Sequence, residues 1–335
     1  MKRFIFSAIA LLVVATACTE SGIIDTPAFY DNAIVFDTYI GKTPVTKALS
    51  FSENELKDSG VQIYAFRKDA TSGIDYSAPY LNGQLQYSGG WAYYEEDSEV
   101  DAYWPEGYDL AFAAYSLNAG NIEVSDEFDF DFTVADDVSE QVDLLAIPLL
   151  EMAAATNGDT QVTLDFKHLL SRVGYSVYAT NGGIEIEIQN IVLKGNFPKN
   201  GNVDLKSNPA KITPYTTGDK AQFVQQYVYF EDEQSFNIDA DDCLLSGDGP
   251  QPIFVDVEYE RFMMIMPYQV NDASIEVTYE LTGSSPHTAT VELGDWEFKA
   301  GYAYEFVFKI SSAAIEFNAV IAPDGWGTEE THPNN

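Results

Sequence analysis

The alternation of apolar and polar residues, repeated along most of the chain, is the feature that most constrains its fold. Residues 274–281 read SIEVTYEL, residues 184–189 read IEIEIQ and residues 128–134 read FDFDFTV. Successive side chains of a β-strand point to opposite faces, so each of these segments predicts a strand with one buried and one solvated face. Turn signals rich in Gly and Asn separate the segments. The sequence therefore predicts an all-β chain.

Helical signals are few. The run Ser52-Glu53-Asn54-Glu55 has the spacing of a capping box, and Gly60 stands where it can end a short helix. One more helical turn is predicted within 166–172. About sixteen candidate strands are too many for one sandwich of seven to nine strands, so we expect two sandwiches in tandem. The expected units are 30–157 and 158–335, divided in the small polar stretch around residues 152–159.

The first seventeen residues have the composition of an export signal. Lys2 and Arg3 precede an uncharged, mostly apolar run that is too short to remain in a membrane as a spanning helix. Two small residues then lead to Cys18, and a cysteine at this point is typical of the lipid-acceptor position of a bacterial lipoprotein. We expect residues 1–17 to be removed and residues 18–29 to form a tether. The alternative is an ordinary signal peptide in which Cys18 has no special role.

The chain is strongly acidic. It has 17 basic and 53 acidic residues, with a formal charge of −36. A surface of this charge repels nucleic acid and anionic lipid, which excludes nucleic acid as a partner. The 21 Tyr and 21 Phe residues predict packed cores rather than disorder. Cys18 and Cys243 are the only cysteines, so acylation of Cys18 leaves no pair for an intrachain disulfide.

The sequence contains no recognisable catalytic or cofactor motif. His168, His287 and His332 lack metal-ligand spacing to a second His or Cys. A G-x-S-x-G elbow, a Walker phosphate loop and an H-E-x-x-H helix are all missing from the sequence. The acidic run at 239–242 lacks the glycine and the terminal Glu of a calcium loop, so we expect a solvated loop there. No catalytic residue, metal or cofactor is predicted.

Six short segments carry a family resemblance through their order and spacing. They read AIVFDTYI at 33–40 followed by TKA at 46–48, YWPEGYDLAFAAY at 103–115, QVDLLA at 141–146, VTLDFKHLLSRV at 162–173, MMIMP at 263–267 and WEFKAGYAY at 296–304. Together they resemble the fimbrillin family, which comprises the type V pilins and related bacterial surface lipoproteins. The likeness covers nearly all of the chain after the export signal.

The resemblance implies a fold and a role. It implies two transthyretin-like β-sandwich domains with very little helix, and export to the cell outer membrane as a palmitate-bearing lipoprotein. It also implies assembly with other fimbrial subunits into a surface fimbrium that contacts host or bacterial ligands. In such a protein, a protease removes the first strand together with the lipid anchor. A strand of another subunit then fills the vacated groove by strand exchange.

The same resemblance assigns positions on this chain. The cut is expected between Lys47 and Ala48, although the family usually has arginine before the cut. The apolar residues of the displaced first strand are Ile34, Phe36 and Ile40, and those of the candidate donor strand are Ile315, Phe317 and Ile321. The physical chemistry of strand edges independently supports strand exchange, because removing an apolar edge strand leaves unpaired backbone groups to which another strand can bind.

Three alternatives remain at the sequence level. Lys42 and Lys47 are equally consistent with solvated loop cations beside a first strand that stays in place. The whole chain is also consistent with a monomeric surface lipoprotein that binds glycan or another ligand on aromatic-rich loops. An enzyme such as a glycosidase is the least favoured alternative, since the many acidic residues guarantee accidental carboxylate pairs.

Overall fold

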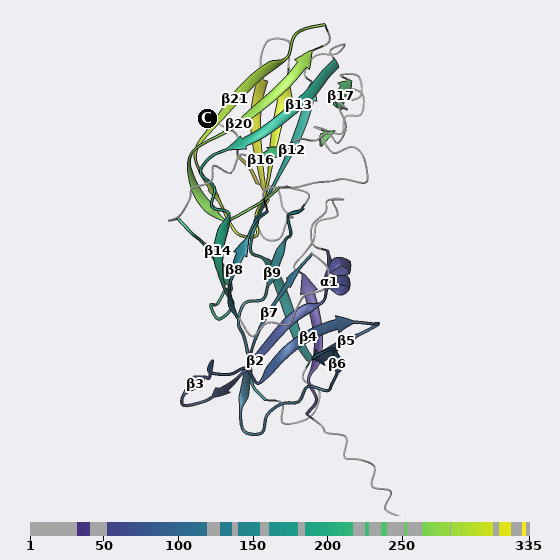
Figure 1. The fold of residues 1–335 in the computed structure, drawn as a ribbon, viewed down its shortest axis with the longest axis vertical. Coiled ribbons are helices and arrows are strands. Elements are labelled where there is room, and N and C mark those ends of the chain that lie inside the picture. The colour runs from purple at the N-terminus through teal and green to yellow at the C-terminus, as the bar shows by residue number, and fades with distance from the viewer. Residues whose placement is uncertain are drawn as a thin grey trace, which may run out of the picture.

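The structure is a computed structural model. It describes residues 32–40, 52–118, 128–135, 140–154, 161–179, 185–216, 225–227, 236–239, 251–252, 263–281, 283–310, 315–322 and 330–332. These residues form four β-sheets and a single α-helix (Figure 1). The prediction of an all-β chain with very little helix is confirmed.

The largest sheet has ten strands and is built mainly from the first half of the chain. Its order is β1-β11-β9-β7-β2-β4-β5-β6, with β10 paired to β7 and β3 paired to β2. The bounds are β1 Val35–Ile40, β2 Val61–Asp69, β3 Gly73–Ile74, β4 Leu81–Tyr87, β5 Trp91–Glu95, β6 Ser98–Glu99, β7 Asp109–Leu117, β9 Leu144–Ala146, β10 Leu150–Met152 and β11 Gln161–His168. In this order β1 is an edge strand.

A three-stranded sheet joins the two halves of the chain. Its order is β15-β14-β8, with bounds β8 Asp129–Thr133, β14 Asn200–Asp204 and β15 Lys211–Pro214. The antiparallel pairing of β8 with β14 brings residues 129–133 beside residues 200–204. In Figure 1, β8 and β14 lie between the lower part of the molecule, which holds β2 and β4, and the upper part, which holds β20 and β21.

Two further sheets contain the remaining strands. The six-stranded sheet has the order β18-β12-β22-β23-β24 with β19 paired to β12, and the five-stranded sheet has the order β16-β13-β20-β21 with β17 paired to β13. The bounds are β12 Ser171–Ala179, β13 Glu185–Lys194, β16 Gln225–Tyr227, β17 Phe236–Asp239, β18 Gln251–Pro252, β19 Met263–Ile265, β20 Tyr268–Leu281, β21 His287–Phe298, β22 Ala303–Ile310, β23 Ile315–Ala322 and β24 Glu330–His332.

The helix α1, Glu53–Ser59, begins and ends at the predicted residues. The backbone N–H of Glu55 donates to the Ser52 hydroxyl, and the Ser52 N–H donates to the Glu55 carboxylate, which completes the capping box. Gly60 ends the helix with a positive φ of 78°, a backbone region that favours glycine. Leu56 is the buried side chain of this helix. The predicted short helix at 53–60 is confirmed.

Two apolar clusters lie on opposite faces of the ten-stranded sheet. The N-terminal core contains Ile63 of β2, Phe112 of β7, Leu56 of α1 and the inward side chains of β1. The long core begins at Tyr64 on the other face of β2 and continues to Ile310 of β22. Because β2 and β7 are buried on both faces, their sequences are nearly continuous apolar runs rather than alternating ones.

The predicted helical turn at 166–172 is wrong, since β11 ends at His168 and β12 begins at Ser171. Strand pairing also crosses residue 158, and the division into units 30–157 and 158–335 stays a prediction. β11 pairs with β1 and β9, and β14 pairs with β8, so segments after residue 158 complete sheets begun before it. Both features depend on pairing between strands far apart in the sequence, which local alternation does not encode.

Candidate functional site

The candidate site is the first strand together with the surface that it covers. β1 lies parallel to β11, with six residue pairs from Val35–Gln161 to Ile40–Phe166. This ladder forms the only side of β1 that is paired in the described part of the sheet. The candidate site is therefore an edge strand whose removal exposes one edge of β11. We call that edge, with the part of the N-terminal core under β1, the β1 seat.

The start of β1 is held by a second contact. The backbone N–H of Ile34 donates to the Ala102 carbonyl oxygen at 2.8 Å, and the Trp104 N–H donates to the Asn32 carbonyl oxygen at 3.0 Å. The Asn32 side-chain amide also donates to the Trp104 carbonyl oxygen, at 3.1 Å. These bonds attach the entry of the strand to the segment before β7. The strand is thus fixed at its beginning as well as along β11.

Alternation decides which side chains of β1 are buried. Ile34, Phe36 and Ile40 are each less than one-tenth exposed, whereas Val35 and Tyr39 are 55% and 44% exposed. Burying an aliphatic or aromatic side chain contributes about 1.5–3 kcal/mol, so these three residues hold β1 in the seat. The three apolar residues assigned to the first strand on sequence grounds all lie on its covered face.

Phe36 occupies an aromatic part of the seat. Its ring meets the ring of Phe112 edge-on, with centroids 6.2 Å apart, and the ring of Tyr93 at 6.4 Å. Trp104 meets the same Phe112 ring at 5.8 Å. Such edge-to-face pairs favour an aromatic side chain at this position beyond the area that it buries. The seat therefore distinguishes position 36 from the other inward positions of the strand, none of which is aromatic.

Gly83 of β4 makes room for Tyr93. A Cβ atom built on Gly83 would lie 2.2 Å from the carbonyl oxygen of Tyr94 and 2.8 Å from the ring of Tyr93. The Tyr93 hydroxyl donates to the Glu95 carboxylate at 2.9 Å. Burial, reinforced by this hydrogen bond, raises the pKa of Tyr93. A glycine within the strand is thus explained by the ring that lies against it.

Thr38 is the fourth inward residue of β1, and sequence analysis did not single it out. Its side chain is buried, and its hydroxyl oxygen has no hydrogen-bond partner among the described residues. An unsatisfied buried polar group costs about 1–3 kcal/mol. That cost exceeds the roughly 0.8 kcal/mol gained by burying one methyl-sized group. Thr38 therefore makes β1 a weaker occupant of its seat than a fully apolar strand would be.

The candidate donor strand is paired within its own sheet. Residues Ile315, Phe317 and Ile321 lie in β23, which pairs antiparallel with β22 over eight residues and with β24 over three. The β24 pairs cover residues 319–321 only, so the first half of β23 forms a sheet edge among the described residues. The expected cleavage residues Lys47 and Ala48 and the expected lipid-acceptor residue Cys18 lie outside the described residues.

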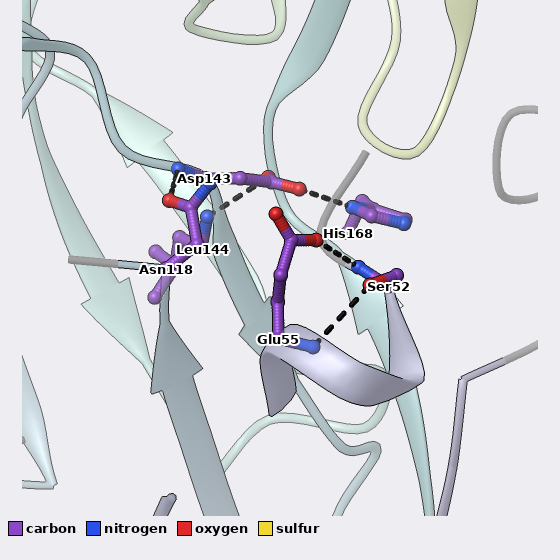
Figure 2. A network of polar contacts seen from close by, with 6 residues as sticks. All are labelled: Ser52, Glu55, Asn118, Asp143, Leu144 and His168. Atoms are coloured by element: carbon purple, nitrogen blue, oxygen red, sulfur yellow. Dashed lines mark hydrogen bonds and ion pairs between the residues drawn. The ribbon is translucent and has the colours of Figure 1, made fainter. Parts of the chain in front are cut away.

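His168 belongs to a buried polar network next to the seat (Figure 2). Its Nδ1 lies 2.6 Å from Asp143 Oδ2, and both side chains are almost fully covered. The other Asp143 carboxylate oxygen accepts from the Leu144 N–H, while the Asp143 N–H donates to the Asn118 side chain. This network joins β11 to β9 and β7. The network gives the buried imidazole of His168 a carboxylate partner.

The described residues hold no group of three or more His, Cys, Asp or Glu side chains arranged to bind a metal ion. No helix among them is both long and apolar enough to span a membrane.

Solved structures share this fold over most of their length. A fimbrial protein from Bacteroides vulgatus aligns with a TM-score of 0.56 and 14% identity, covering 88% of this chain and 100% of its own. A candidate cell adhesion protein from Bacteroides uniformis aligns with a TM-score of 0.53 and 14% identity, covering 88% and 99%. A similar candidate from Bacteroides ovatus has a TM-score of 0.51 and 15% identity, covering 89% and 99%. At these identities the likeness shows the fold alone.

Sequence comparison identifies the family more directly. No curated protein matches the chain. A family profile described as fimbrillin-like matches residues 46–323, which is most of the chain. The matched region runs from just before the expected cut to the end of β23, so it includes every strand of the described fold except β1 and β24. The chain belongs to the fimbrillin-like family.

Proposed function

We propose that this chain is a fimbrial subunit that is exported as a lipoprotein and assembles by protease-triggered strand exchange. Cys18 carries the lipid and places the precursor at the outer membrane. Cleavage after Lys47 separates both the anchor and β1 from the rest of the chain. The vacated seat then receives a strand of another subunit. The proposal assigns no catalytic residue.

The observation that carries the proposal is the position of β1. It is an edge strand, paired along one side, and its inward residues cover the N-terminal core. Its loss would expose both the backbone groups of β11 and the apolar seat. Exposed strand edges of this kind are completed by strands from other chains. Membership of the fimbrillin-like family supports assembly with other fimbrial subunits.

Limited proteolysis of the purified full chain tests the proposal. Trypsin is expected to cut early near Lys47, and the cut product is expected to form multimers that resist SDS. A variant with both Lys42→Gln and Lys47→Gln should remain uncut in this linker and stay monomeric, while Lys42→Gln alone is the matched control and should still be cut after Lys47. A wild-type product that stays monomeric after release of β1 would contradict subunit exchange and favour a monomeric surface protein that binds glycan or another ligand.

Lipid attachment is tested separately. Metabolic labelling with a palmitate analogue should label the wild-type precursor, and Cys18→Ser should abolish the label. A Cys243→Ser variant is the matched control, because it removes the other cysteine and should remain labelled. Labelling that survives Cys18→Ser would show that the anchor lies elsewhere or that the chain is not a lipoprotein.

A further inference from the structure

We infer that Arg67, near the end of β2, is the centre of a binding site for a sugar acid, a hexose ring that bears one carboxylate and several hydroxyls. Three observations carry the site: two tyrosine rings hold the guanidinium, this cation forms no ion pair among the described residues, and the groups around it accept hydrogen bonds. Such a site would give the protein a ligand of its own, whether or not subunits join by strand exchange.

The guanidinium of Arg67 lies over two tyrosine rings. Its Cζ atom is 4.8 Å from the centre of the Tyr80 ring and 5.8 Å from the centre of the Tyr108 ring. The Tyr80 ring is itself fixed, because its hydroxyl donates to the Tyr103 carbonyl oxygen at 3.0 Å and the ring packs against the N-terminal core. A guanidinium stacks on aromatic rings through its faces, so its in-plane N–H groups are not used by the contact. The rings therefore orient Arg67 and leave it able to donate hydrogen bonds.

Arg67 is exposed and forms no ion pair within the described part of the chain. Acidic partners are plentiful in a chain with 53 acidic and 17 basic residues, and the next residue, Lys68, pairs with Glu151. Asp75 lies nearby, since its N–H donates to the Arg67 carbonyl oxygen at 2.9 Å, but its carboxylate accepts from the N–H and the hydroxyl of Ser77. The planar fork of donors on Arg67 thus suits a carboxylate from outside the chain.

The neighbouring groups favour a sugar over an acidic peptide. Asp101 is exposed and accepts from the Tyr103 hydroxyl at 3.0 Å, and the exposed Glu106 lies two residues before Tyr108. Ionised carboxylates accept hydrogen bonds and do not donate them. An acidic peptide would bring several further carboxylates, which this acidic surface repels. A sugar acid brings one carboxylate for Arg67 and hydroxyl donors for the acidic residues beside it.

Tyr108 supplies apolar surface to the site. Its side chain is 41% exposed, in contrast to the aromatic rings of the two cores. A sugar ring has an apolar face of C–H groups, which packs on an aromatic ring in the same way as other apolar groups do. The inferred contact therefore has three parts: the carboxylate at Arg67, the hydroxyls at the nearby acidic side chains, and the ring face at Tyr108.

Ligand-observed NMR titration of the full chain tests the ligand class. The probes are the methyl glycosides of glucuronic, galacturonic and mannuronic acid, each compared with the methyl glycoside of the corresponding neutral sugar. At least one of the acids should bind at millimolar concentration, and its neutral counterpart about tenfold more weakly, equivalent to about 1.4 kcal/mol. Failure of all three acids to bind would overturn the inference, and so would equal binding of an acid and its neutral counterpart.

Substitutions at Arg67 test the position. Arg67→Lys keeps the positive charge but loses the planar fork, so the acid that binds best should bind about tenfold more weakly. Arg67→Gln should abolish binding. Lys211→Gln is the matched control, because it removes another exposed cation, on β15, and should leave binding unchanged. Sugar-acid binding that survives Arg67→Gln would overturn the site. Since Arg67 is exposed, all three variants should unfold at the same urea concentration as the wild type.

A hexaglutamate peptide separates the two sources of carboxylate. It should bind more weakly than the best sugar acid. If it binds more tightly than every sugar acid and this binding is lost in Arg67→Gln, the fork receives a protein carboxylate and the assignment to a sugar fails. None of these outcomes depends on cleavage near Lys47, so the site and strand exchange are tested independently.

Discussion

At the scale of single residues, the inward side chains of the first strand differ in how firmly they bind the β1 seat. Phe36 fills an aromatic position, while Thr38 buries a hydroxyl without a partner among the described residues. Both are inward residues of the same short strand. β1 is therefore bound less firmly than its apolar pattern alone would suggest, and removing the Thr38 hydroxyl is enough to change how firmly it is bound.

Thr38→Val should strengthen that hold. Valine has nearly the shape of threonine and lacks the unsatisfied hydroxyl, so we expect the free energy of unfolding to rise by about 1–3 kcal/mol. Urea denaturation of the uncut chain measures this change. Thr163→Val on the exposed face of β11 is the control and should change stability by no more than about 0.5 kcal/mol. An equal gain in both variants would assign the effect to strand propensity instead.

Gly83→Ala should loosen the aromatic part of the seat. The new Cβ would meet the Tyr94 carbonyl oxygen at 2.2 Å and the Tyr93 ring at 2.8 Å, so β4 or β5 has to shift. Overpacking of this kind costs about 1–3 kcal/mol, measured as a loss of thermal or urea stability. Gly90→Ala is the matched control, since a Cβ there meets nothing within 4 Å. Tolerance of Gly83→Ala would show that Tyr93 does not need this space.

At the scale of elements, the sequence predicted local features well and long-range pairing poorly. The capping box and Gly60 predicted α1, and alternation predicted that Ile34, Phe36 and Ile40 share a face of one strand. The predicted helical turn at 166–172 is wrong because β11 continues to His168, whose side chain lies on the buried face of the strand. A polar residue at this position interrupts the apolar alternation, so the sequence does not show that the strand extends this far. Asp143, distant in sequence, provides the partner that makes a buried histidine acceptable there.

Asp143→Ala should weaken the junction of β11 with β9. It removes the 2.6 Å contact with His168 and the hydrogen bond accepted from Leu144, both of them buried. We expect a loss of about 1–3 kcal/mol in urea denaturation. Asp165→Ala on the exposed face of β11 is the control, because a surface ion pair such as that with Lys167 contributes at most about 1 kcal/mol. Equal losses in the two variants would contradict a special role for the buried pair.

At the scale of the whole molecule, the sheets interlock more than the sequence suggests. Alternation predicted the fold class, but it does not show that β14 returns to β8 or that β11 completes the first sheet. The long core contains residues from both halves of the chain, from Tyr64 to Ile310. Two further features cannot be predicted from the sequence: the register of β1 on β11 and the lack of a described hydrogen-bond partner for the Thr38 hydroxyl. Each depends on atoms that are distant in sequence.

Buried tyrosines in both cores should make the whole fold sensitive to alkali. Burial raises the pKa of Tyr93 in the N-terminal core and of Tyr175 and Tyr304 in the long core. In the unfolded chain a tyrosine loses its proton near pH 10, whereas the folded chain retains it. The free energy of unfolding should therefore be insensitive to these groups below about pH 10 and fall above it, by about 1.4 kcal/mol per pH unit for each tyrosine.

Urea denaturation between pH 7 and pH 11.5 measures this dependence. Above about pH 10, the free energy of unfolding of Tyr93→Phe should fall less steeply with pH than that of the wild type, by the contribution of one tyrosine. Between pH 7 and pH 9, the free energies of unfolding of the two proteins should change with pH in the same way. The comparison uses slopes, so the hydrogen bond to Glu95 that the variant also loses does not enter. An unchanged alkaline slope in Tyr93→Phe would contradict a raised pKa at this residue.

The parallel ladder between β1 and β11 also has a mechanical consequence. Tension along the axis of the strand loads all six residue pairs at once, so they must shear together. A force that lifts one end breaks the pairs one after another and meets far less resistance. A fibre whose subunits are joined by a strand in this position would withstand pulling along its length, yet the same joint would remain open to a competitor that invades from the strand's end.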